Sequence, residues 1–151
     1  MSEATWDPPE VPPADDVSTP YWDATREHRL TVQSCGACGH VQHPPRAVCT
    51  ACSSMEHLSQ VDAAGTGAVD TFTTVHRAPR PELDAPYTVA RVRLAEGPVV
   101  LTRLEPAVPD QRAWTIGDPV AVAWADLPDG RALPYFTPSL GSTSPDTTKE
   151  H

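Results

Sequence analysis

The sequence contains little positive charge and no long apolar run. Its 11 Lys and Arg residues stand against 20 Asp and Glu residues, which leaves a formal net charge of −9. The resulting negative field repels phosphate backbones and anionic lipid headgroups, so nucleic acid is a disfavoured partner. A membrane span needs about 18 consecutive apolar residues, and the sequence offers none. These two absences argue against nucleic-acid-binding proteins and membrane proteins.

The start of the chain lacks the basic and then apolar pattern of a secretory signal. Residues 1–18 are rich in proline and acidic side chains. Such a segment buries little apolar surface, so conformational entropy favours a disordered leader. We therefore expect a cytoplasmic protein. Cytoplasmic thiols stay reduced, and cysteines that occur in close pairs then indicate a metal site in preference to disulfides.

Two C-x-x-C motifs are the strongest signal in the chain. Cys35 and Cys38 form the first motif, Cys49 and Cys52 form the second, and ten residues separate them. Two tight turns that each offer two thiolates complete a tetrahedral zinc site with Zn–S distances of about 2.3 Å. Because four thiolates fill every position, we expect one structural zinc per chain. Iron, as in rubredoxin, fits the same cage and stays an alternative.

Glycines and histidines surround the two motifs. Gly36 and Gly39 are expected to supply the positive φ angles of the first turn. His40, His43 and His57 are near the site in sequence but are surplus as ligands, because four thiolates already complete it.

After the second motif the apolar residues follow a period of two, which is typical of strands. We expect strands at Leu58–Asp62, Ala68–His76, Tyr87–Leu94, Val99–Leu104 and Val120–Ala125. Five short strands with no helix-length segment between them predict a small closed barrel, because closure removes exposed strand edges. Before the first motif, Thr19-Pro20 marks the start of a short helix that extends to about His28.

The order helix, ribbon and barrel resembles the acyl-CoA-associated zinc-ribbon/OB-fold family, long catalogued as a domain of unknown function. The resemblance covers roughly residues 19–138. The matching segments are Tyr21-Trp22, Cys35–Gly39, His43–Arg46, Cys49–Cys52, Gly65–Gly67, Phe72–Pro79, Pro86-Tyr87, Glu96–Pro98 and Ile116-Gly117. One departure is Asp70, which stands where the family usually has an aromatic residue.

The resemblance implies a small mainly-β fold with a short N-terminal helix, a rubredoxin-like zinc ribbon and a five-stranded OB-fold barrel. The domain boundaries that it implies are a disordered leader at 1–18, the helix at 19–30, the ribbon at 31–57, the OB-fold at 58–138 and a disordered tail at 139–151.

The resemblance also implies a non-catalytic accessory subunit in a hetero-oligomer. The partner would be a thiolase-like enzyme, an aldolase of lipid-transfer-protein type or a hydratase, acting on steroid, lipid or polyketide-type acyl-CoA thioesters. The residues fit this role independently, because the chain has no G-x-S-x-G elbow and the metal site takes every cysteine. A nucleic-acid-binding ribbon/OB module, a free-standing enzyme and a rubredoxin-like electron carrier stay open as alternatives.

Coenzyme A is polyanionic, so an acidic protein needs local basic groups to hold it. The candidates are Arg46 beside the second motif and His76, Arg77 and Arg80 at the exit of a long strand. Solvated side chains or surface ion pairs explain the same residues equally well. We expect Arg46 and Arg77 to meet between the ribbon and the mouth of the barrel.

Aromatic pairs at two places are candidate anchors for a partner protein. Tyr21 and Trp22 lie in the short helix, and Tyr135 and Phe136 lie near the end of the OB-fold region. Aromatic anchors dominate interface energies when they are exposed, but the same residues also suit the protein's own core.

Overall fold

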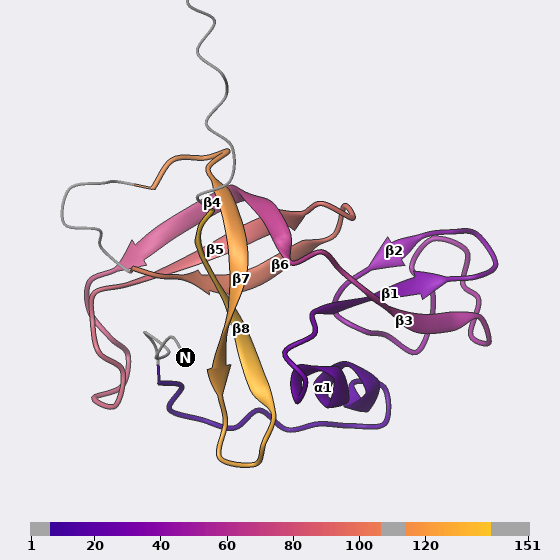
Figure 1. The fold of residues 1–151 in the computed structure, drawn as a ribbon, viewed down its shortest axis with the longest axis horizontal. Coiled ribbons are helices and arrows are strands. Elements are labelled where there is room, and N and C mark those ends of the chain that lie inside the picture. The colour runs from indigo at the N-terminus through magenta and orange to yellow at the C-terminus, as the bar shows by residue number, and fades with distance from the viewer. Residues whose placement is uncertain (1–6, 107–113, 140–151) are drawn as a thin grey trace, which may run out of the picture.

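The computed structural model describes residues 7–106 and 114–139, which form one helix, a small three-stranded sheet and a closed five-stranded barrel (Figure 1). The elements are α1 (Thr19–Thr25), β1 (Thr31–Cys35), β2 (Val41–Gln42), β3 (Leu58–Asp62), β4 (Thr66–Val75), β5 (Tyr87–Leu94), β6 (Val99–Leu104), β7 (Pro119–Asp126) and β8 (Ala132–Pro138). The small sheet has the order β2-β1-β3, and the barrel has the order β4-β5-β6-β8-β7. The expected mainly-β fold of helix, ribbon and OB-fold barrel is confirmed. No helix among the described residues is long and apolar enough to cross a membrane.

Helix α1 is shorter than the sequence indicated, because it ends at Thr25 and not near His28. A compact turn precedes it, in which the Ser18 N–H donates to the Asp15 carboxylate at 2.8 Å. His28 has a φ of 53°, a left-handed conformation that cannot continue a helix. The chain therefore turns after α1 and enters the small sheet.

Strand β3 belongs to the ribbon sheet, whereas the sequence placed Leu58 at the start of the barrel. It pairs antiparallel with β1 over its whole length, from Thr31 opposite Asp62 to Cys35 opposite Leu58. The barrel begins after the bend that follows, at Thr66. A period-two pattern shows that a strand has two different faces, but it does not show which sheet the strand joins.

The fifth barrel strand is β8, which the sequence analysis did not identify as a strand. It pairs antiparallel with β7 from Val120 opposite Pro138 to Asp126 opposite Ala132. Its contact with β6 is a short parallel one, at Leu104 and Phe136. Proline lacks an N–H donor, so Pro134 and Pro138 obscured the strand, but the sparse pairing with β6 tolerates them.

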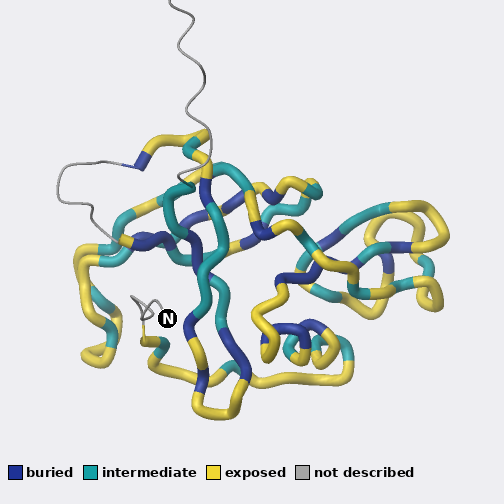
Figure 2. The backbone as a smooth tube through the Cα atoms, viewed as in Figure 1, coloured by how far each residue is buried: buried dark blue, intermediate teal, exposed yellow. Residues whose placement is uncertain are grey.

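The core is continuous from the helix through the ribbon into the barrel. Figure 2 shows buried backbone in α1, in β1 and along the barrel strands. The buried cluster that links these elements consists of Tyr21, Leu30, Val32, Val69, Ala90, Val92, Leu94, Val100, Leu104, Trp114, Val120 and Phe136. The helix is fastened to β8 as well, because the Ala132 N–H donates to the Thr25 hydroxyl at 3.2 Å. The ribbon and the barrel therefore share one apolar interior.

Part of the leader follows a defined path over the barrel. The Arg131 guanidinium donates to the Pro12 carbonyl at 2.6 Å, and Glu10 pairs with Arg80 in the loop after β4. Disorder was expected for the whole of residues 1–18, but these polar contacts hold the described part of that segment without a large apolar surface. Residues 1–6 and nearly all of the expected tail, residues 140–151, lie outside the described part of the chain.

Most of the aromatic residues proposed as partner anchors lie inside the protein. Tyr135 and Phe136 are 4% and 0% exposed, and Tyr21 is 7% exposed. Successive strand residues point to opposite faces, so the burial of both Tyr135 and Phe136 means that β8 is covered on both sides. Trp22 is half-buried, and the Arg131 guanidinium lies 4.8 Å from its ring centroid. The Tyr135-Phe136 segment is therefore not a docking site, and the anchor hypothesis was wrong for it.

The close approach of β4 to β5 at Gly67 generates a stability prediction. A Cβ atom at Gly67 would lie 2.4 Å from the Arg93 carbonyl oxygen, which is backbone and cannot move aside easily. Gly67→Ala should therefore lower the free energy of unfolding by about 2 kcal/mol. Gly36 is the control, because its Cβ would meet nothing nearer than 3.5 Å and its φ is not positive. We expect Gly36→Ala to stay within about 0.5 kcal/mol of wild type. Equal denaturation midpoints for the two variants would contradict the prediction.

Candidate metal centre

Two similar turns present the four cysteines at one end of the ribbon. In the first turn the Gly39 N–H donates to the Cys35 carbonyl at 2.8 Å, and in the second the Ser53 N–H donates to the Cys49 carbonyl at 2.9 Å. Gly39 and Ser53 have positive φ angles of 78° and 66°. Gly36 does not, so the expectation of a left-handed residue at that position was wrong. The second turn meets the same requirement with a serine, which is a rarer choice than glycine.

The four sulfur atoms have the spacing of a tetrahedral thiolate site. All of them lie within 4.8 Å of one another, and both the Cys35–Cys52 and the Cys38–Cys49 Sγ distances are 3.7 Å. A tetrahedron with metal–sulfur bonds of about 2.3 Å has sulfur–sulfur edges of about 3.8 Å. The residues therefore fit a zinc-sized ion, and they leave no ligand position open.

Burial differs between the members of each pair. Cys35 and Cys49 are each 1% exposed, whereas Cys38 and Cys52 are exposed. The centre thus lies at the surface of the ribbon, with one thiol of each turn directed inward. A site with this position can tie two loops together without a cavity for a substrate.

Backbone amides favour the thiolate forms of Cys38 and Cys49, whereas neighbouring thiols raise the pKa of Cys38 and lower that of Cys49. The N–H groups of Cys52 and Ala51 favour the Cys49 thiolate and lower the pKa of that thiol to about 6. The His40 N–H favours the Cys38 thiolate, but desolvation and the other three thiols outweigh it and raise the pKa of Cys38 to about 12. Four adjacent thiolates repel one another, so full ionisation requires a cation at their centre.

Two buried glutamines hold the loop between the motifs, and sequence reasoning missed them. Gln33 and Gln42 are each 6% exposed, and the Gln42 amide donates to Gln33 Oε1 at 2.6 Å. Gln42 Oε1 also accepts from the Thr50 N–H at 2.9 Å, and Gln33 bonds both backbone groups of Arg46. Gln33 and Gln42 are opposite one another in the pairing of β1 with β2, which only the structure shows.

The three flanking histidines are not part of the thiol cluster. The His40 imidazole bonds the Thr50 hydroxyl at 3.0 Å, and His57 is exposed. The His43 ring packs against Tyr21 with 5.3 Å between ring centroids, and burial lowers the pKa of His43 to about 4. His43 therefore links the ribbon to α1 as a neutral ring.

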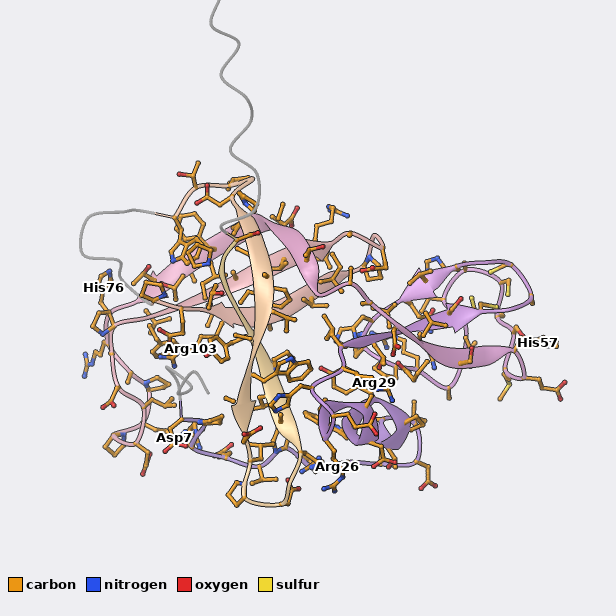
Figure 3. All side chains as sticks on the ribbon, in the orientation of Figure 1. Asp7, Arg26, Arg29, His57, His76 and Arg103 are labelled. Atoms are coloured by element: carbon orange, nitrogen blue, oxygen red, sulfur yellow. The ribbon has the colours of Figure 1, made fainter. Side chains whose placement is uncertain are left out.

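The candidate coenzyme A residues do not come together. Arg46 belongs to the ribbon, where its exposed side chain lines a shallow hollow of about 210 Å³ beside the start of α1. His76 and Arg77 follow β4 and are exposed. Figure 3 shows His76 at the end of the barrel that is farthest from the ribbon. His57, in the ribbon, lies at the opposite end of the molecule. The structure therefore does not bring Arg46 and Arg77 together between ribbon and barrel.

Asp70 departs from the resemblance, and the structure gives it a role in β4. The pairing of β4 with β5 shifts register between Val69 and Thr71, so Asp70 is the extra residue of a bulge. Its carboxylate lies 3.8 Å from the Arg91 guanidinium and 3.4 Å from that of Arg93. Both arginines are exposed on the solvent side of the barrel.

Two family models match the two parts of the chain. Residues 22–56 match the rubredoxin-like zinc ribbon domain of ChsH2, and residues 60–125 match the C-terminal OB-fold domain of ChsH2. Together they cover the metal centre and most of the barrel.

Individual proteins show the same likeness. A probable enoyl-CoA hydratase alpha subunit of Thermomonospora curvata is 36% identical over 85% of this chain, which spans only 40% of that relative's length. A DUF35 domain-containing scaffold protein of Pyrococcus furiosus is 38% identical over 60% of this chain and 67% of its own length. The solved structure of the Ltp2-ChsH2(DUF35) aldolase contains a chain that superposes with a TM-score of 0.74 at 35% identity, covering 85% of this chain and 98% of that one. The chain therefore belongs to the ChsH2-type (DUF35) family, in which a rubredoxin-like zinc ribbon is joined to an OB-fold.

Proposed function

We propose that the chain is a non-catalytic accessory subunit that binds a thiolase-like aldolase or a hydratase and supports its action on acyl-CoA thioesters. The observation that carries the proposal is the likeness to the aldolase structure. The superposition with this protein covers 98% of the length of one chain of that structure. The chain spans 40% of the length of the hydratase alpha subunit that it resembles. We place the complex in the cytoplasm, where the four thiols stay reduced.

The metal centre supports a structural role in that complex. Its four thiolates leave no position for water or substrate, so the metal would hold the ribbon and would not take part in a reaction. We propose one zinc per chain, held by Cys35, Cys38, Cys49 and Cys52.

Metal analysis tests this part of the proposal. The purified protein should contain about one equivalent of zinc, and Cys49→Ser should lose the metal and unfold the ribbon, because metal binding contributes on the order of 10 kcal/mol to such sites. His40→Ala and His57→Ala are the controls and should retain the full equivalent. Zinc content by elemental analysis and ribbon structure by NMR supply the measurements. Iron in place of zinc would overturn the metal assignment, and loss of metal in a histidine variant would overturn the ligand set.

Co-expression tests the accessory role. The chain should co-purify with a thiolase-like aldolase or hydratase subunit from the same genome as a complex of defined mass, as measured by size-exclusion chromatography and native mass spectrometry. The complex should cleave or hydrate an acyl-CoA substrate, and the isolated chain should do neither. Substantial turnover by the chain alone, or complete separation of the two proteins, would contradict the proposal.

We also propose that coenzyme A contacts this chain directly through a basic side chain. A guanidinium can bind a phosphate through charge-assisted hydrogen bonds in spite of the net negative charge, since the long-range field is screened beyond about 8 Å at physiological salt. His76 with Arg77, or alternatively Arg46, can fill this role. Arg46 lies in the ribbon beside the start of α1, whereas Arg77 follows His76 at the end of the barrel farthest from the ribbon, so we do not expect one nucleotide to engage both.

A pair of variants in the complex distinguishes a nucleotide contact at Arg77 from one at Arg46. We favour Arg77, so Arg77→Ala should raise KM for the coenzyme A ester about tenfold and leave KM for a truncated thioester without the nucleotide unchanged. Arg46→Ala is the matched variant at the other end and should leave both values unchanged. The reverse result would move the nucleotide to the ribbon, and unchanged kinetics in both variants would remove the contact from this chain.

A further inference from the structure

The outer surfaces of β5 and β6 form an exposed face that neither the metal centre nor the candidate coenzyme A residues explain. On β5 the buried residues alternate with outward ones, and Arg91 and Arg93 are exposed. On β6, Leu101 lies opposite Arg91 in the strand register. We call this surface the β5–β6 face, and it comprises Tyr87, Val89, Arg91, Arg93, Leu101 and Arg103.

An apolar groove crosses this face. One hollow of about 240 Å³ extends from Thr71 to Leu101, and another of about 350 Å³ extends from Leu101 to Leu133 on β8. Both are lined by Val89 and Leu101, so they adjoin one another. Leu101 is 81% exposed, more than any other large apolar side chain in the described part of the chain. Exposed apolar area of this kind marks interaction sites in proteins that are otherwise polar at the surface.

The charges around the groove are opposite in sign to those of the whole chain. The side chains of Arg91 and Arg93 are 56% and 57% exposed, whereas Asp70, the carboxylate between them, is 30% exposed. At the other end, Arg103 pairs with Glu105, whose side chain is 8% exposed. A molecule that approaches this face therefore meets guanidinium groups first, although the net charge of the protein is −9. Arg93 also donates to the Gly97 carbonyl at 3.3 Å, but this carbonyl and the single Asp70 carboxylate offer fewer acceptors than the ten N–H donors of two guanidiniums.

We propose that the β5–β6 face is the docking surface for the protein partner. This inference rests on the proposed function and adds the place of contact. The partner would insert an apolar side chain between Val89 and Leu101 and would direct carboxylates at Arg91 and Arg93. Complementary charge of this kind raises the rate of encounter and sets the register of the two proteins.

The groove suits a protein better than a single-stranded nucleic acid. Nucleic acids bind to such surfaces by stacking bases on exposed aromatic rings. Tyr87 is the aromatic residue of this face, and the Arg103 guanidinium lies 5.5 Å from its ring centroid. Val89 and Leu101 line both hollows, and Phe72, which also lines one of them, is packed against the core. A ring held in this way offers little free face for stacking, and the aliphatic side chains favour insertion of side chains from a folded partner.

Binding measurements on the co-expressed complex test the surface. Leu101→Glu should weaken partner binding at least 30-fold, and Arg91→Glu should weaken it about tenfold, with the larger loss at low salt. Met55→Glu is the matched control, because Met55 is 69% exposed but belongs to the ribbon. It should change the Kd less than twofold. The side chains of Leu101 and Arg91 are exposed, so circular dichroism should show that all three variants fold.

Each outcome decides the inference. If Leu101→Glu and Arg91→Glu bind the partner as tightly as the wild type does, the docking surface is overturned and the accessory role is left intact. A wild-type chain that binds neither type of partner would overturn the proposed function, and the docking surface with it. Tight binding of a single-stranded oligonucleotide that is lost in Arg91→Glu, while the protein complex persists, would assign the face to nucleic acid and overturn the proposal.

Discussion

The thiol cluster is the constraint on which the ribbon depends. The ribbon sheet has three short strands, and a sheet of this size does not bury enough apolar surface to fold independently. Its two loops converge because Cys35, Cys38, Cys49 and Cys52 place their sulfur atoms within 4.8 Å of one another. The same convergence brings β1 to β3, and through Leu30 and Val32 the ribbon then joins the core of the barrel. A metal ion bound at the surface would thus stabilise an interior that extends well beyond the site.

The sequence predicted those features that depend on local spacing and missed those that depend on contacts between distant segments. The spacing of the two C-x-x-C motifs was enough to predict, without a structure, that the four thiols lie together. The barrel strands β5 and β6 were found with their bounds, because Tyr87–Leu94 and Val99–Leu104 are bounded by a clear turn. The sequence did not predict that β3 joins the ribbon sheet or that β8 closes the barrel, because a period-two pattern does not show which strand is the partner. The separation of Arg46 from Arg77 has the same cause.

The net charge of the protein does not describe the charge of each part of its surface. A net charge of −9 describes the average surface, and it disfavours partners with extended phosphate backbones. A binding surface responds to its own groups, however, because fields from distant exposed charges are screened within about 8 Å. On β5, Arg91 and Arg93 are neighbours on one face, and the bulge at Asp70 brings a single carboxylate to both. A basic surface therefore exists on an acidic protein because strand alternation collects side chains of one kind.

The metal centre and the barrel both have the properties of structural elements, which suits an accessory subunit. The thiolates close the metal site, and the core fills the interior of the barrel with Val69, Val92, Leu104, Val120 and Phe136. The hollows described above lie at the surface of the barrel and of the ribbon. What this part of the chain offers instead is a rigid surface, since helix, ribbon and barrel share one core. A rigid surface binds a partner with little loss of conformational entropy, and this is the property that a scaffold needs.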